Sequence, residues 1–178
     1  MAASGLDPAT IFSFPLDDFQ LEAIDALNQG HSVVVSAPTG SGKTLVGEYA
    51  IHRALAHGQK VFYTTPLKAL SNQKLRDFRE AYGEHNVGLM TGDLSVNREA
   101  SIVVMTTEIF RNMLYAEADS SDDPLADVEA VVLDECHYMN DTQRGTVWEE
   151  SIIHCPPSVQ LVALSATVAN AGQLTDWI

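Results

Sequence analysis

Short apolar runs rich in β-branched residues alternate with amphipathic stretches along the chain, and this alternation restricts the possible folds most strongly. The residues predicted as strands are 31–36, 60–65, 86–90, 102–106, 130–134 and 160–164. The residues predicted as helices are 43–57, 67–82, 108–116 and 145–153. Strands such as Val33–Val35 and Ala130–Leu133 are apolar on both faces, as in a parallel sheet that helices cover on both sides. The pattern predicts a doubly wound α/β domain.

The composition is that of a folded domain with a sizeable core. Of the 178 residues, 46% are hydrophobic and 19% charged, which excludes a disordered polyelectrolyte. Uninterrupted apolar runs reach only the length of Ala130–Leu133, against about 20 residues for a membrane helix, so we expect no membrane partner. No basic residue precedes Lys43, which argues against a basic signal or transit peptide. Two cysteines, Cys136 and Cys155, suggest a reducing compartment, the cytoplasm or an equivalent such as the plastid stroma.

Charge is unevenly distributed along the sequence. The formal net charge of −14 argues by itself against a nucleic-acid partner, because phosphates repel an acidic protein. Residues 43–111, however, hold nine basic and seven acidic side chains, whereas the remainder holds one basic side chain, Arg144, and 17 acidic ones. One segment is therefore suited to face an anion despite the acidic average.

A glycine-rich loop, Ala37–Thr44, follows the first predicted strand and opens the first predicted helix. Backbone N–H groups of such a loop wrap a phosphate chain, and the start of the helix adds the positive end of its dipole. In this position Lys43 would reach the β- and γ-phosphates of a nucleotide, and the Thr44 hydroxyl would ligate Mg²⁺. Ala37 replaces the usual first glycine, which leaves the cradle usable. The other expected phosphate-binding residues are Pro38, Thr39, Gly40, Ser41 and Gly42.

An acidic pair follows a later predicted strand, as a nucleotide site requires. Asp134 and Glu135 come directly after Ala130–Leu133, at the sheet edge where ligands bind. Asp134 would hold Mg²⁺, and Glu135 would orient and deprotonate an attacking water. Two acids at a strand end alone are more often helix caps. Together with the phosphate loop they favour a catalytic site.

The motifs together resemble the first motor lobe of a superfamily 2 helicase of the DExH type. They are the phosphate loop, Asp134–His137 and Ser165–Thr167, with Thr65–Lys74, Thr91–Asp93, Thr106–Glu108 and Gln143–Glu150. The set is similar to the superkiller, or antiviral, RNA helicases, including their cyanobacterial and chloroplast relatives. DEAD-box proteins fit less well, because residue 137 is His rather than Asp. The resemblance implies a RecA-like P-loop NTPase domain at 14–178, after an N-terminal extension at 1–13.

The resemblance also implies roles for residues that would otherwise look ordinary. Phe14 would stack on the adenine and Gln20 would bond its polar edge, although by spacing alone they read as a core aromatic and a helix-surface residue. His137 would link the nucleotide site to Ser165 and Thr167, and so couple hydrolysis to movement of the nucleic-acid strand. A lone histidine is more often a satisfied core residue.

Three turns are expected to line one groove, since each follows a predicted parallel strand. In the resembling family such turns grip a sugar-phosphate backbone, which positions a strand without reading its sequence. The expected contact residues are Thr65, Pro66, Lys68, Gly92, Thr106 and Thr107. Further along the helix at 67–82, Arg76 and Arg79 read as a solvated face, and Arg111 is left undecided. Lys74 falls within the apolar arc of that helix and would have to extend its amine to solvent.

The resemblance implies an ATP-dependent RNA helicase that uses ATP and Mg²⁺ and moves along single-stranded RNA. Such a motor needs a second RecA-like lobe, which supplies an arginine finger worth about 10³–10⁵ in rate. Because the sequence stops soon after Thr167, we expect the second lobe to be absent and this chain alone to hydrolyse ATP barely. Adaptor proteins are not specified by these motifs.

Three alternatives remain at this point. A DNA helicase of the same superfamily would carry the same motifs, because backbone contacts barely distinguish the sugars unless the 2′-OH is read. A nucleotide-gated nucleic-acid-binding scaffold would bind without unwinding. A small P-loop kinase or GTPase fits worst, because it would lack the pairing of Asp134–His137 with Ser165–Thr167.

Overall fold

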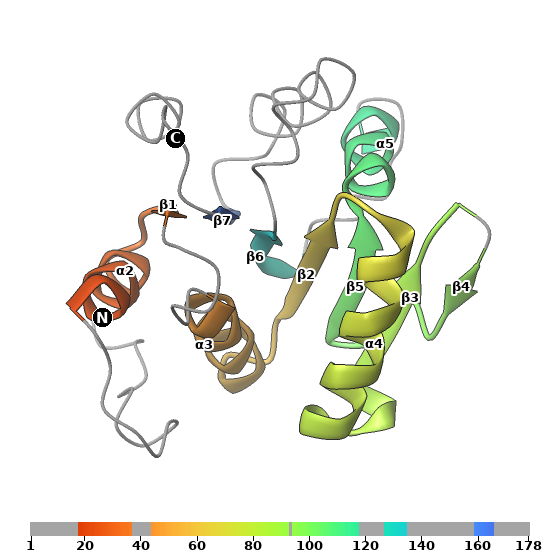
Figure 1. The fold of residues 1–178 in the computed structure, drawn as a ribbon, viewed down its shortest axis with the longest axis horizontal. Helices are drawn as coiled ribbons and strands as arrows, with labels where there is room; N and C mark the ends of the chain where they lie inside the picture. Colours follow the sequence, from red (N-terminus) through yellow and green to blue (C-terminus); the bar gives the residue numbers. More distant parts are fainter. Residues whose placement is uncertain (1–17, 37–43, 93, 118–126, 135–158, 166–178) are drawn as a thin grey trace.

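A computed structural model of the chain describes residues 18–36, 44–92, 94–117, 127–134 and 159–165 (Figure 1). The strands in these residues are β1 (Val33–Ser36), β2 (Lys60–Thr65), β3 (Val87–Met90), β4 (Ser95–Val96), β5 (Ile102–Thr106), β6 (Val128–Leu133) and β7 (Gln160–Ser165). The helices are α2 (Asp18–Asn28), α3 (Thr44–Ala56), α4 (Lys68–Tyr82) and α5 (Thr107–Glu117), with a 3₁₀ turn, η1, at Glu84–Asn86.

One seven-stranded sheet in the order β1-β7-β6-β2-β5-β3-β4 organises the described residues. Every neighbouring pair is parallel except β3 and β4, which are antiparallel. The order is not sequential, because crossover helices carry the chain between strands. This confirms the predicted doubly wound α/β fold with a mainly parallel sheet.

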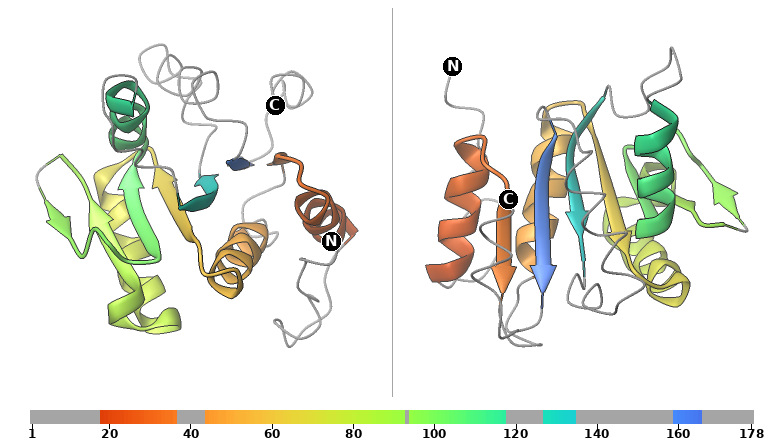
Figure 2. Two further views of the ribbon diagram at one scale, coloured as in Figure 1. Left: turned by 180° about the vertical axis from the view of Figure 1, so that it is seen from behind. Right: turned by 90° about the horizontal axis from the view of Figure 1, so that it is seen from above.

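Two apolar clusters cover the two faces of the sheet. On one face, α2, α3 and α4 pack on side chains such as Val61, Val104 and Val132. On the other, α5 packs through Phe110 on alternate positions such as Val103 and Val131. Figure 2 shows helices on both sides of the strands, as two-faced burial of parallel strands requires.

The helix α3 packs on the sheet through Gly47, and contacts at its other end fix its direction. A Cβ atom on Gly47 would be 3.3 Å from both Leu164 Cδ1 and Val132 Cγ1, so glycine permits the approach. At the far end of the helix, Arg53 Nη1 donates to Gln160 Oε1 at 2.7 Å and lies 3.9 Å from Glu129 Oε2. These contacts hold the end of α3 at the amino-terminal edge of β6 and β7, so its start faces the opposite edge.

Most predicted elements are confirmed within a few residues at each end. Gly58 and Gly83 follow α3 and α4 with φ of 69° and 93°, as expected for glycines that end helices. The structure adds α2, η1 and β4, which the alternation did not predict. The helix predicted at 145–153 lies outside the described residues. In the part of the chain that the structure describes, no helix is both long and apolar enough to span a bilayer.

Candidate nucleotide site and strand-binding edge

The carboxyl ends of the parallel strands meet at one edge of the sheet. Their register aligns Ser36 with Ser165, Ala163 with Leu133, and Leu133 with Thr64. Thr65 is aligned with Thr106, and Met90 with Met105. Neighbouring strands lie about 4.8 Å apart, so the ends form a row that runs from β1 through β6 to β3.

The proposed phosphate loop connects β1 to α3 at one end of this row. Its residues Pro38, Thr39, Gly40, Ser41, Gly42 and Lys43 lie outside the described residues. So do Phe14, Glu135, His137 and Thr167. The backbone is described for Thr44, the first residue of α3, and for Ser165, the last residue of β7. The loop thus follows a strand and precedes a helix, as the phosphate-loop motif requires.

Asp134 follows β6 and is buried, with 2% of its surface exposed. Its backbone N–H donates to Thr64 O at 2.9 Å, which continues the ladder between β6 and β2. The Tyr63 hydroxyl donates to Asp134 Oδ2 at 2.6 Å, and Lys74 Nζ lies 3.8 Å from the same oxygen. A buried carboxylate is stable only with partners of this kind.

The sequence-based expectation for Lys74 was therefore incomplete. Its side chain is 24% exposed and runs over the rings of Tyr63 and Phe78, at 5.6 and 6.0 Å from their centroids, toward buried Asp134. The helical pattern placed Lys74 correctly on the packed side of α4, but it contains no information about a carboxylate on β6. Tyr63 was missed for the same reason, since a tyrosine in an apolar strand reads as core.

Titratable groups of α3 and α4 influence one another where the two helices meet. Burial raises the pKa of Glu48, and the nearby Lys74 ammonium opposes that rise. Burial, together with the charge of Glu48, raises the pKa of Tyr82. Burial lowers the pKa of His52, whose ring meets that of Tyr82 edge to face at 5.2 Å. The space between the two helices therefore disfavours unpaired charge.

The donor set fits a magnesium ion that is shared with a nucleotide. Within the described residues, no three His, Cys, Asp or Glu side chains come together as a metal cage. Mg²⁺ commonly binds through one or two carboxylates, water and substrate phosphates rather than such a cage. One buried carboxylate at the sheet edge, with α3 beginning nearby, is consistent with that arrangement.

The predicted strand-binding residues lie on the same edge but differ in exposure. Lys68 and Gly92 are exposed, and Pro66 and Thr106 are partly buried. Thr65 and Thr107 are buried, so contact through their side chains is excluded in this conformation. The Thr65 hydroxyl donates to Leu67 O at 2.9 Å and is 2.7 Å from Ser71 Oγ. The Thr65 hydroxyl thus stabilises the turn before α4 rather than facing a nucleic-acid strand.

The start of α4 offers backbone donors at this edge. Leu67 occupies the N-cap position without a side-chain hydrogen bond to the helix. The first N–H groups of a helix lack intrahelical partners and attract anions. Further along, Arg76 is exposed, as expected for a solvated face, whereas Arg79 is partly buried.

Of the two residues expected at the adenine, only Gln20 lies within the described residues. Gln20 is 4% exposed in α2, so the simple interpretation of a helix-surface residue is wrong. Phe19, in the same helix, packs against the core. Burial of a glutamine implies a polar partner, which agrees with a specific role but does not identify the adenine.

Comparison with known proteins agrees with the motif resemblance. The chain is 58% identical over 171 residues to the "DExH-box ATP-dependent RNA helicase DExH15 chloroplastic" of Arabidopsis thaliana, which covers 95% of this chain and 15% of that protein. It is 51% identical over 172 residues to the "Antiviral helicase SKI2" of Saccharomyces cerevisiae, which covers 97% of this chain and 13% of that protein. The chain thus spans about one seventh of the length of these relatives.

Solved helicase structures share the fold. The Mycobacterium smegmatis helicase Lhr, bound to single-stranded DNA and AMP-PNP, matches with a TM-score of 0.67 at 29% identity over 90% of this chain and 24% of that one. The helicase MrfA, bound to DNA and AMPPNP, matches with a TM-score of 0.75 over 99% of this chain and 28% of that one, at 19% identity. The fold is thus that of a RecA-like helicase domain. The DEAD/DEAH box helicase model matches residues 17–174, and the chain belongs to that family.

Proposed function

We propose that residues 14–178 form the ATP-binding motor lobe of an ATP-dependent RNA helicase and that residues 1–13 are an extension. The observation that carries the proposal is the order of groups along the carboxyl edge. Asp134, at the end of β6, lies between the strand that leads to the phosphate loop and the turns at Pro66 and Gly92. The order of groups therefore suits a nucleotide at one end of the edge and a nucleic-acid strand at the other.

The nucleotide end would bind ATP through the residues before and at the start of α3. We assign adenine contacts to Phe14 and Gln20, and contacts with the β- and γ-phosphates to Lys43. The backbone cradle for the phosphates is assigned to Pro38, Thr39, Gly40, Ser41, Gly42 and Thr44. AMP-PNP in the Lhr structure and the printed name of the Arabidopsis relative support ATP as the nucleotide.

The hydrolytic step would use the acidic motif after β6. Thr44 and Asp134 would hold Mg²⁺, which when bound neutralises charge on the phosphates. Glu135 accepts a proton from the attacking water and orients it toward the γ-phosphate. Lys43 stabilises the negative charge on the oxygens of the γ-phosphoryl group during the transfer.

The strand end would hold RNA through its backbone at the turns after β2, β3 and β5. Lys68 and Gly92 are exposed there, and the uncapped start of α4 adds N–H donors. We assign further contacts to Pro66 and Thr106, and backbone contacts to Thr65 and Thr107. His137, Ser165 and Thr167 would couple this end to the nucleotide, because β7 lies between β1 and β6.

Translocation would require a second RecA-like lobe that closes on ATP with RNA across both lobes. Hydrolysis and release would then reopen the cleft, so cycles of differential affinity move the strand. A reducing compartment, the cytoplasm or the plastid stroma, suits the two cysteines.

The substitution Glu135→Gln in the full-length protein tests the proposal. We expect ATP turnover to fall about 10²–10⁴-fold, because the water loses its base, while ATP affinity stays within a factor of a few. Turnover is measured as phosphate release, and affinity by titration with a fluorescent ATP analogue. Glu84→Gln, an exposed acid in η1, is the matched control and should change neither. Unchanged turnover of the Glu135 variant would contradict the assignment.

A DNA helicase is the second candidate, favoured by the single-stranded DNA in the Lhr structure. Stimulation of ATP turnover by RNA and DNA strands of matched sequence and length separates the two. We expect stronger stimulation by RNA, as the names of the Arabidopsis and related proteins suggest. Stronger stimulation by DNA would favour the second candidate.

A further inference from the structure

Two side chains with no part in the proposed chemistry hold the carboxylate of Asp134. The Tyr63 hydroxyl donates to Oδ2 at 2.6 Å, and Lys74 Nζ is 3.8 Å from that same oxygen. The carboxylate is 2% exposed, so water does not substitute readily for either contact. Both contacts on one oxygen restrict rotation of the carboxylate about its Cβ–Cγ bond.

We propose that Tyr63 and Lys74 are positioning residues that orient the Asp134 carboxylate for the Mg²⁺ of bound ATP. The inference rests on the proposed function, since the orientation matters in this way only if the edge binds Mg²⁺–ATP. Groups behind a metal ligand commonly fix its direction, and their loss costs about 10–100-fold in metal affinity or activity.

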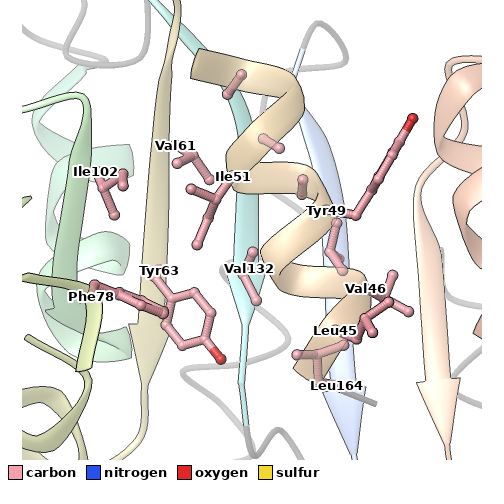
Figure 3. Close-up of a cluster of buried hydrophobic side chains, with 14 of the residues drawn as sticks. Leu45, Val46, Tyr49, Ile51, Val61, Tyr63, Phe78, Ile102, Val132 and Leu164 are labelled. Carbon is pink, nitrogen blue, oxygen red and sulfur yellow. The ribbon is translucent and has the colours of Figure 1, made fainter. Parts of the chain in front are cut away.

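The two positioning residues are themselves held by aromatic packing. Tyr63 is 1% exposed, and its ring meets that of Phe78 edge to face at 4.9 Å. Figure 3 shows Tyr63 beside Phe78, with its hydroxyl directed toward the carboxyl ends of the strands. Lys74 lies over both rings. A hydroxyl on a fully packed ring and an ammonium over two ring faces have little freedom to leave Asp134.

The position of Lys74 links three elements of the site. It belongs to α4, whose first residue, Lys68, faces the proposed RNA track. It contacts Asp134 after β6, and it is close enough to Glu48 of α3 to oppose the rise of that carboxyl's pKa. The ion pair therefore joins α4 to the proposed Mg²⁺-binding acid, and the charge of Lys74 also acts on Glu48 of α3.

The test measures Mg²⁺ dependence rather than activity alone. In the full-length protein, binding of a fluorescent ATP analogue is titrated with MgCl₂ for the wild type, Lys74→Met and Tyr63→Phe, and repeated in EDTA. Lys74→Met keeps the apolar stem and removes the charge, and Tyr63→Phe removes a single oxygen. We expect each variant to need about 10-fold more Mg²⁺ for half-maximal binding, with binding in EDTA unchanged.

The controls separate positioning from packing. Lys74→Arg retains a cation and should recover most of the Mg²⁺ dependence, whereas Arg76→Met, on the exposed side of the same helix, should be wild type throughout. If Lys74→Met does not fold, Tyr63→Phe still tests whether the contacts with Asp134 set the Mg²⁺ requirement. An unchanged Mg²⁺ requirement, or an equal loss of binding in EDTA, overturns the inference. If Glu135→Gln still abolishes turnover in that case, the proposed function stands and only the positioning role falls.

Discussion

Gly88 in β3 is a residue at which no side chain fits. A Cβ atom there would lie 2.1 Å from Asn97 O and 2.8 Å from Val96 O, and both are backbone oxygens that cannot rotate away. Asn97 has a φ of 49°, and its Nδ2 donates to His85 O at 3.0 Å. The hairpin of β3 and β4 thus closes directly on Gly88, next to the turn that exposes Gly92.

Replacement of Gly88 by alanine should therefore destabilise the domain. We expect Gly88→Ala to lower the free energy of unfolding by about 1–3 kcal/mol, the usual cost of overpacking, measured by urea denaturation. Gly92→Ala is the matched control, because nothing lies within 4 Å of a Cβ atom there, and it should stay within about 0.5 kcal/mol of wild type. Equal stabilities for the two variants would refute this account of the hairpin.

Candidate site residues could be named from the sequence where they belong to a motif. Residues that only the tertiary structure brings to the site could not. Asp134 was placed at the carboxyl edge of the sheet from its position after an apolar strand, and the structure places it there, next to Thr64. Its binding of Mg²⁺ stays a prediction. Tyr63 and Lys74 were not predicted at the site, because they reach Asp134 from β2 and α4 and are 71 and 60 positions away in sequence. Periodicity reports which face of an element is packed, but not which polar atom on another strand it meets.

At the scale of elements, the start of α4 differs chemically from the rest of the helix. Lys68 is exposed beside the uncapped first turn, whereas Arg76 is exposed two turns further from the edge. Salt largely screens exposed charges that are more than about 8–10 Å apart, and eight helical residues, about 12 Å, separate Arg76 from Lys68. The two residues therefore make a matched pair for a test.

Substitution of Lys68, but not of Arg76, should weaken binding of RNA. For Lys68→Ala in the full-length protein we expect a loss of about 1 kcal/mol for any sequence of single-stranded RNA, with the salt slope reduced by about 0.7. Fluorescence anisotropy with a labelled RNA at several KCl concentrations measures both. Arg76→Ala should match wild type. A larger effect at Arg76 would place the RNA along the helix instead of at its start.

Elements with a strong internal pattern were predicted almost to the residue, and those that depend on tertiary contacts were not. The bounds of β2 and β5 coincide with the predicted ranges because long β-branched runs end at clear breaks. The two-residue strand β4 has no pattern of its own and exists only through its pairing with β3. The predicted helix ranges also left out α2, although Gln20 was interpreted as a helix-surface residue and the buried side chains of α2 recur at helical spacing.

At the scale of the whole molecule, the acidic net charge is compatible with the proposed strand-binding edge, because the proposed contacts do not depend on bulk charge. The net charge is −14, yet residues 43–111 hold a slight basic excess and include every proposed strand contact. Among the described residues, the groups proposed to contact the strand are turns, a helix start and one exposed cation, Lys68. Such groups bind a strand by shape and hydrogen bonds more than by release of many counterions.

The 178-residue domain alone should therefore bind RNA weakly and with a shallow dependence on salt. With about one or two phosphates neutralised, the slope of log K against log[salt] is expected near −1, at about −0.7 per phosphate for single strands. The acidic remainder repels the strand at long range, so low salt should strengthen binding less than it does for a basic domain of this size. Anisotropy titrations of labelled single-stranded RNA at KCl concentrations between about 50 and 200 mM measure this slope. A tight complex with a steep slope would mean that the strand crosses a basic surface that the row of turns does not provide.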